Sequence, residues 1–253
     1  GFQRCALVLP VGDQRIEAET IGHGGSGRNV GLVNAGLWLP PDVVCKTLGA
    51  QAGERLNSAL AAAPDRVFGL IERFGIACNP RRNGTLHLAH APRGVTQLQE
   101  RHSQQVRRAA PVTLLDAEET RARTGSDAFH GALHDARAGT IQPLAYARGL
   151  ARAAQGQGAR IFENSPALSA IRHGGHWVIR TSGGKLRSKA LLVATNAYHR
   201  PVGDMIIPKV PQVNFFQLAT EPLGDNIAHD ILPGGEGCWD TAMIMSSLRR
   251  DAA

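Results

Sequence analysis

The chain has 253 residues, of which 43% are hydrophobic, so it can form a packed core and global disorder is excluded. No apolar run approaches the ~20 residues needed to span a bilayer, and no secretory signal is visible, so we expect a cytoplasmic protein without an integral membrane segment. The formal net charge of +7 is spread over short arginine doublets and aromatic residues are only 5%, which argues against nucleic-acid binding.

The four cysteines are dispersed and form no C-x-x-C pair, and the ten histidines show no H-E-x-x-H spacing. Because neither a zinc site nor a redox dithiol is indicated, we predict reduced thiols and no metal.

Two short strands are predicted first, over residues 6–10 and 15–18, and a glycine-rich loop follows them. Glycines occur there at positions 22, 24, 25, 27 and 31, around Ser26, Arg28 and Asn29. Glycines let backbone amides approach a ligand closely, and arginine adds positive charge. The loop therefore predicts a site for a phosphate-bearing cofactor.

The sequence of this loop also partly matches other motifs. Residues 22–27 match G-x-G-x-x-G, but no clear helix follows, and the acids Glu17 and Glu19 precede the loop instead of following it. The loop is also a near miss to a P-loop, with Arg28 in place of lysine and Asn29 in place of the hydroxyl residue. An NTPase and a flexible surface loop are thus alternatives to the cofactor loop.

The middle of the chain alternates helical and extended patterns. Apolar periodicity predicts a largely helical region from residue 42 to 75, and the polar segment 94–109 is helix-prone. A strand is expected at residues 85–88, a capping box at Asp116–Glu119 opens a short helix ending at Gly125, and a further strand is expected at 129–134.

A clearer helix begins at Gln142–Pro143 and ends at the glycines 156 and 158. An antiparallel meander over residues 167–188 follows, and then a buried strand over 190–195. Ligands bind outside the carboxyl ends of such strands, where the small Ala194 and the hydroxyl of Thr195 permit close approach.

The first of these motifs resembles a known family. Glu17–Ala18, Gly25-Ser26-Gly27-Arg28-Asn29 and Gly31 resemble the second conserved block of the FAD-dependent amine and amino-acid oxidoreductases, which include D-amino-acid oxidase, glycine oxidase and sarcosine oxidase. The Ser-Gly-Arg-Asn form is most similar to the bacterial branch with γ-glutamylputrescine oxidase. Val30 and Leu32 depart from that branch, which often has Gly and Gln there.

Later blocks extend the resemblance in the same order along the chain. They lie at residues 139–150, 165–167, 194–198, 239–241 and 249–251.

The resemblance implies FAD as cofactor and a role for each matching residue. Glu17, with Ala18, would bind the adenosine ribose, and the loop residues Gly25, Ser26, Gly27, Arg28, Asn29 and Gly31 would lie against the pyrophosphate and flavin. The remaining cofactor contacts would come from Pro166, Ala167, Ala194, Thr195 and Asn196. Tyr198 and Arg249 are the candidate catalytic residues, and Arg249 could bind a substrate carboxylate through its bidentate fork.

The implied fold is α/β (α+β overall). An incomplete Rossmann-type FAD-binding domain would comprise residues 1–75 and 139–203, and an interleaved antiparallel-sheet substrate domain residues 76–138 and 204–253. The implied reaction is oxidation of a C–N bond of a small amine or amino acid by hydride transfer to the flavin.

The family's own G-x-G-x-x-G is expected about 20 residues or more before Glu17. Residues 1–15 cannot supply it, and the family continues beyond the residues that end this chain. We therefore expect a fragment truncated at both ends. The alternative is a non-catalytic remnant or interaction module that no longer binds FAD. The sequence specifies neither the amine, nor the electron acceptor, nor the oligomeric state.

Overall fold

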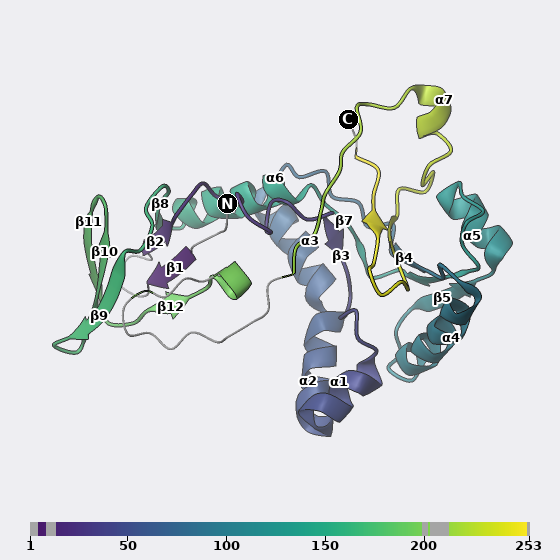
Figure 1. Ribbon diagram of the computed structural model, residues 1–253, viewed down its shortest axis with the longest axis horizontal. Helices are drawn as coiled ribbons and strands as arrows, with labels where there is room; N and C mark the ends of the chain where they lie inside the picture. Colours follow the sequence, from purple (N-terminus) through teal and green to yellow (C-terminus); the bar gives the residue numbers. More distant parts are fainter. Residues whose placement is uncertain (1–4, 9–13, 199–201, 203–212, 252–253) are drawn as a thin grey trace. The chain divides into compact units, whose positions relative to one another are not determined.

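The computed structural model describes residues 5–8, 14–198, 202 and 213–251 (Figure 1). The chain divides into two compact units, one formed by Gly1–Asn29 and Pro143–Leu218 and the other by Val30–Gln142 and Ala219–Ala253. We call them unit 1 and unit 2.

The part of unit 1 that the structure describes contains two sheets and one long helix. The strands of the first sheet, in the order β12-β1-β2-β8, are Leu192–Val193, Cys5–Val8, Gln14–Glu17 and Arg160–Phe162. β2 and β8 are parallel, whereas β1 is antiparallel to both of its neighbours. The long helix α6 (Pro143–Gly156) leads into β8, as its proline start and glycine stop predict.

The predicted meander is confirmed as β9 (Ser169–His173), β10 (His176–Thr181) and β11 (Gly184–Ser188), which form an antiparallel sheet. Ala170 and Ile179 from this sheet form a buried cluster with Ile16 of β2. The meander and the first sheet therefore share one core.

The prediction of a buried strand over residues 190–195 is wrong. Only Leu192–Val193 form a strand, and their side chains are 49% and 40% exposed. In the described part of unit 1, β12 is an edge strand that pairs only with β1. An apolar run predicts an extended segment, but its burial depends on what covers it.

The helical region of unit 2 is confirmed as α1 (Pro41–Leu48), α2 (Ala50–Ala61) and α3 (Ala63–Phe74). Gly49, at φ +83°, separates α1 from α2. A Cβ at Gly53 would lie 2.4 Å from the Cα of Cys45, so only glycine lets α2 approach α1 this closely.

The main sheet of unit 2 has the strand order β14-β13-β4-β6-β5, and only β13 and β4 are parallel. The strands in that order are Ser247–Leu248, Gly237–Asp240, Thr85–Leu88, Ala132–Asp135 and Val112–Leu115. Helices α4 (Pro92–Val106), α5 (Ala117–Thr124) and α7 (Asp225–Ala228) and the two-stranded sheet of β3 (Leu32–Val33) and β7 (Gly139–Thr140) complete the described part of the unit.

All four side chains of strand β4 are buried, and they alternate between the two faces of the sheet. Leu86 and Leu88 pack with Cys238 and other apolar residues on one face. Thr85 and His87 point to the opposite face.

The capping box is confirmed. The Asp116 side chain accepts a hydrogen bond from the Glu119 amide at 2.8 Å, and the Glu119 carboxylate accepts one from the Asp116 amide at 2.9 Å. Gly125 ends α5 in the left-handed conformation, as predicted.

The α/β fold class is confirmed by this mixture of helices, two parallel strand pairs and antiparallel pairs. The compact units do not follow the predicted domain boundaries throughout, because residues 30–75 belong to unit 2. The assignment of cofactor and substrate roles to the domains stays a prediction.

Candidate functional site

Glu17 lies at the carboxyl end of β2, and it is only 2% exposed. Its carboxylate accepts a hydrogen bond from the Glu19 amide at 3.2 Å. Its backbone carbonyl accepts one from the Ser165 amide at 2.7 Å. The predicted ribose acid and the 165–167 block are therefore neighbours, although more than 140 residues separate them in sequence.

The glycine-rich loop closes on itself through turns. The amides of Gly27 and Arg28 both donate to the Gly24 carbonyl at 3.1 Å. The Asn29 side-chain amide donates to the carbonyls of Gly25 and Ser26, at 2.9 and 3.1 Å. Asn29 thus stabilises the loop, a role that the sequence did not indicate, while the side chains of Ser26 and Arg28 are exposed.

Two of the loop glycines are required by packing. A Cβ at Gly27 would lie 2.1 Å from the Gly22 carbonyl oxygen, and one at Gly22 would lie 2.6 Å from the Cδ1 of Leu144 on α6. Gly22 also has φ +78°, which disfavours any other residue. The glycine pattern is therefore explained in part by close packing of the loop on itself and on α6.

The block at residues 194–198 approaches the same loop. Residues Asn196–Tyr198 form a 3-10 turn, in which the Tyr198 amide donates to the Thr195 carbonyl at 2.9 Å. A Cβ at Gly25 would lie 2.9 Å from the Tyr198 hydroxyl oxygen, so this hydroxyl lies against the loop backbone. Unit 1 therefore brings Tyr198 to the predicted cofactor loop.

The other predicted contacts in unit 1 differ in exposure. Pro166 and Ala167 are half-buried, and Ala167 packs against the core cluster of Ile16. Ala194 and Asn196 are exposed and Thr195 is half-buried. Their roles as cofactor contacts stay predictions.

Arg249 and Gly31 belong to unit 2. The Arg249 Nε donates to the Val30 carbonyl at 2.6 Å, and its Nη2 forms an ion pair with Asp251 at 2.9 Å. The carbonyl of buried Gly31 accepts a hydrogen bond from the Ile141 amide at 2.9 Å. The guanidinium of Arg249 already has these partners, and its role as a carboxylate anchor stays a prediction.

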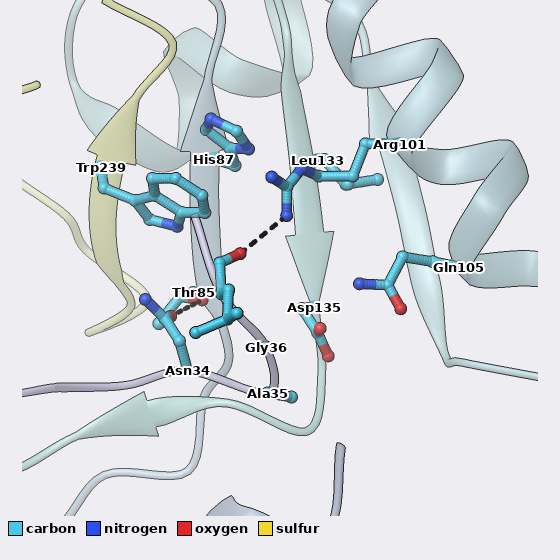
Figure 2. Close-up of a pocket in the computed structure, with 11 residues that line it drawn as sticks. Asn34, Ala35, Gly36, Thr85, His87, Arg101, Gln105, Leu133, Asp135 and Trp239 are labelled. Carbon is cyan, nitrogen blue, oxygen red and sulfur yellow. Dashed lines mark hydrogen bonds between the residues drawn. The ribbon is translucent and has the colours of Figure 1, made fainter. Parts of the chain in front are cut away.

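Unit 2 also holds a small cavity of about 40 Å³, lined by apolar and polar residues, that the sequence did not predict (Figure 2). Arg101 and Gln105 of α4, His87 of β4, Trp239 of β13 and the segment 34–37 line it. The available sequence signal was β4 itself, where Thr85 and His87 alternate with leucines on a predicted strand.

Within this cavity, the rings of His87 and Trp239 stack at 3.6 Å with an interplanar angle of 8°. The Arg101 guanidinium lies 5.5 Å from the centre of the Trp239 ring. Burial lowers the pKa of Arg101 to about 10, so it stays protonated at neutral pH. Burial, with the nearby Arg101 charge, lowers the pKa of His87 to about 3, so its ring is neutral.

The low pKa of His87 predicts a pH dependence of stability. The folded-state pKa lies below the ordinary 6.5, so the unfolded chain binds the proton more tightly, and stability is lost as pH falls from about 6.5 towards about 3. We expect His87→Phe, which keeps a ring to stack on Trp239, to lose less unfolding free energy than wild type between about pH 7 and about pH 4.

Urea unfolding at a series of pH values measures this difference. His173→Phe, at an exposed position on β9, is the control and should retain the wild-type dependence. Equal losses in wild type and His87→Phe would contradict the prediction.

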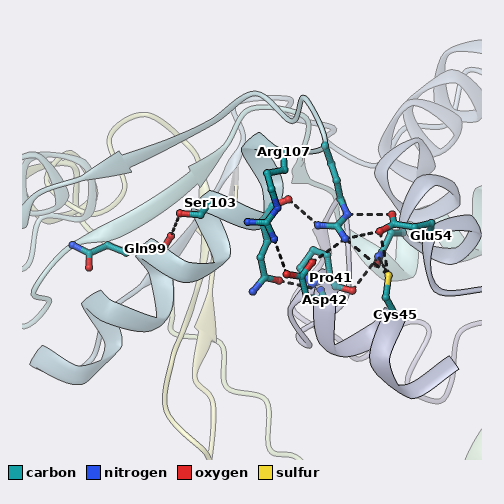
Figure 3. A network of polar contacts seen from close by, with 10 residues as sticks. Pro41, Asp42, Cys45, Glu54, Gln99, Ser103 and Arg107 are labelled. Atoms are coloured by element: carbon teal, nitrogen blue, oxygen red, sulfur yellow. Dashed lines mark hydrogen bonds and ion pairs between the residues drawn. The ribbon is translucent and has the colours of Figure 1, made fainter. Parts of the chain in front are cut away.

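A second polar network joins α1, α2 and the end of α4 (Figure 3). Arg108 forms ion pairs with Glu54 at 2.5 Å and with Asp42 at 2.9 Å, and Arg107 also pairs with Asp42 at 2.6 Å. Hydrogen bonding to Arg108 lowers the pKa of Glu54 to about 2. Burial and the neighbouring Glu54 raise the pKa of the Cys45 thiol, which disfavours the reactive thiolate. We assign this network a structural role.

Among the described residues, no group of three or more His, Cys, Asp or Glu side chains is placed to hold a metal ion. None of the helices in that part of the chain is both long and apolar enough to cross a membrane.

Two features are typical of a dinucleotide-dependent oxidoreductase. One is an acid at the end of a parallel strand with a glycine-rich loop after it, and the other is a separate antiparallel sheet. Comparison with known proteins identifies the family, because the model of the family described as FAD dependent oxidoreductase (DAO) matches residues 15–246. The chain belongs to this family, and the predicted resemblance is confirmed. FAD is the cofactor of the family.

Individual relatives agree with this assignment. Gamma-glutamylputrescine oxidoreductase of Escherichia coli is 32% identical over 242 residues, which cover 94% of this chain and 56% of the relative. The probable oxidoreductase OrdL of Haemophilus influenzae is 28% identical over 247 residues, with the same two coverages. The chain thus spans about half the length of these relatives.

Among solved structures, glycine oxidase from Geobacillus kaustophilus is similar with a TM-score of 0.59 and 24% identity, covering 72% of this chain and 48% of the oxidase. At this identity the likeness establishes the fold alone.

Proposed function

We propose that this chain is part of an FAD-dependent oxidoreductase that oxidises a C–N bond of a small amine or amino acid. The main observation in support is the position of Glu17, buried at the end of β2 and bonded to the backbone of Ser165. Family membership and the name of the Escherichia coli relative support an amine-containing substrate.

The chemistry of unit 1 fits part of an FAD site. The Glu17 carboxylate can accept hydrogen bonds from ribose hydroxyls, and exposed Ser26 and Arg28 can donate to a pyrophosphate. When bound, FAD supplies the acceptor for the hydride. The remaining proposed contacts are the residues that the sequence predicted, namely Ala18, Gly25, Gly27, Asn29, Gly31, Pro166, Ala167, Ala194, Thr195 and Asn196.

We propose that Tyr198 and Arg249 act by positioning the cofactor loop and the substrate. Tyr198 would hold the cofactor loop through the contact of its hydroxyl with the Gly25 backbone. Arg249 would attract a substrate carboxylate by its charge, and its bonds to Val30 and Asp251 would fix its orientation. A cytoplasmic location also stays a prediction.

We expect the 253-residue chain to bind FAD weakly. In dinucleotide sites the pyrophosphate rests on the N-terminus of the helix that follows the G-x-G-x-x-G loop, and no such strand-loop-helix motif precedes Glu17 in this sequence. The purified chain should be colourless and bind added FAD poorly in a flavin-fluorescence titration. Stoichiometric FAD in the purified chain would contradict this prediction.

A longer form, extended by the codons that precede Gly1 in its gene, tests the proposed function itself. It should contain G-x-G-x-x-G, be yellow, and show bleaching of its flavin absorbance on anaerobic addition of an amine substrate. If the extended form lacks the motif and ignores FAD, the non-catalytic remnant or interaction module is the better description.

A further inference from the structure

Arg101 is a buried cation without a carboxylate partner. It is 7% exposed, and its guanidinium donates to the backbone carbonyls of Leu37, at 3.1 Å, and Trp38. No salt bridge of the described residues includes it, and the carboxylate of Asp135, which also lines the cavity beside Arg101, pairs with Arg137 at 2.6 Å. Burying an unpaired charge costs several kcal/mol, so an anion beside Arg101 would be strongly stabilised.

The cavity beside Arg101 limits the size of that anion. Its volume of about 40 Å³ has room for about three non-hydrogen atoms, since one water occupies roughly 10–15 Å³ on this measure. A carboxylate group has three such atoms. A phosphate group has five, so a carboxylate matches the enclosed volume better.

The walls of the cavity add polar groups. Gln105 points from α4 towards the same strands as Arg101, one helical turn further along (Figure 2). His87, which is buried and lines the cavity, has no hydrogen-bond partner at Nδ1 among the described residues. The ring of Trp239 forms an apolar wall beside the guanidinium.

We propose that this cavity binds a carboxylate group through Arg101. The carboxylate belongs either to a free small acid or to a larger ligand such as an amino acid, whose remaining atoms would extend out of the cavity. The site lies wholly in unit 2, and none of its residues is a predicted FAD contact. It therefore does not depend on the proposed oxidoreductase activity.

Titration of the 253-residue chain with sodium acetate tests the proposal. Sodium chloride keeps the ionic strength constant, and calorimetry and tryptophan fluorescence, to which Trp239 contributes, measure binding. We expect saturable acetate binding that is weakened at least about tenfold in Arg101→Gln, because a charge-assisted hydrogen bond is lost.

Arg93→Gln is the matched control, since it removes the same charge from an exposed position of the same helix. It should bind acetate as wild type does. Absence of saturable binding to wild type, or equal binding by Arg101→Gln, overturns the proposal.

Gln105→Glu tests the site without removing Arg101, in case Arg101→Gln fails to fold. The new carboxylate would lie four residues from Arg101 on α4, where Arg137 donates to the Gln105 Oε1 at 3.3 Å, so it adds a negative charge at the cavity wall and should weaken acetate binding. Circular dichroism verifies that the variant is folded. Wild-type acetate affinity in folded Gln105→Glu overturns the proposal.

Glycine and ethylamine distinguish the sources of the carboxylate. Binding of acetate and glycine alike supports a site for any small carboxylate, and binding of glycine alone supports an amino-acid carboxylate. Binding of ethylamine in preference to both overturns the proposal, because the recognised group would then be the amine.

Discussion

Replacing Gly27 with alanine is expected to destabilise the cofactor loop by about 2–3 kcal/mol and, in an FAD-binding extended form, to weaken FAD binding at least about tenfold. The added Cβ would lie 2.1 Å from the Gly22 carbonyl oxygen. No side-chain rotation relieves this clash, because the oxygen belongs to the backbone. The loop would have to open, which would disturb its bonds to the Gly24 carbonyl.

Thermal unfolding of the 253-residue chain and FAD titration of the extended form measure the two effects. Gly156→Ala is the matched control, because Gly156 lies in the same unit and nothing lies within 4 Å of its added Cβ. Unchanged stability and FAD affinity in Gly27→Ala would show that the loop does not hold this conformation. A stability loss without a loss of FAD affinity would argue against the loop as a cofactor contact.

The second large effect is expected at the core of unit 2, where Leu86→Ala should lower the free energy of unfolding by about 3–4 kcal/mol. Leu86 is fully buried on β4, in the cluster with Leu88, Leu115 and Cys238. Truncation removes apolar contacts and leaves a cavity that a strand paired on both sides cannot close. Thr85 and His87, its neighbours on the opposite face, should shift with the strand.

Urea unfolding followed by tryptophan fluorescence measures the loss. Leu48→Ala is the control, because Leu48 lies on α1 and is 51% exposed. Its effect should be within about 0.5 kcal/mol, as for ordinary surface substitutions. Similar effects of the two substitutions would contradict the assignment of Leu86 to the core.

The order of the motifs was sufficient to predict the family. Glu17 precedes the glycine-rich loop instead of following it, and this order favoured the second block of an FAD site over a stand-alone dinucleotide fingerprint. The family match over residues 15–246 confirms the family, and the roles of these residues stay predictions. The capping box at Asp116–Glu119 and the helix from Pro143 were also predictable, because the bonds that define them join residues a few positions apart.

Only the tertiary structure decided the environment of these elements. The run at residues 190–195 was predicted to be buried, yet among the described residues the side chains of Leu192 and Val193 are 49% and 40% exposed. The requirement for Gly27 comes from the Gly22 carbonyl and from Leu144 on a helix more than 100 residues away.

The cavity beside Arg101 could not be predicted from any one stretch of the sequence, because its lining comes from α4, β4, β13 and the segment 34–37. The sequence by itself determined the local elements, the order of the cofactor motifs and, through them, the family. The tertiary structure decided which side chains are buried and which meet, because burial and long-range contacts depend on distant segments that no local pattern specifies.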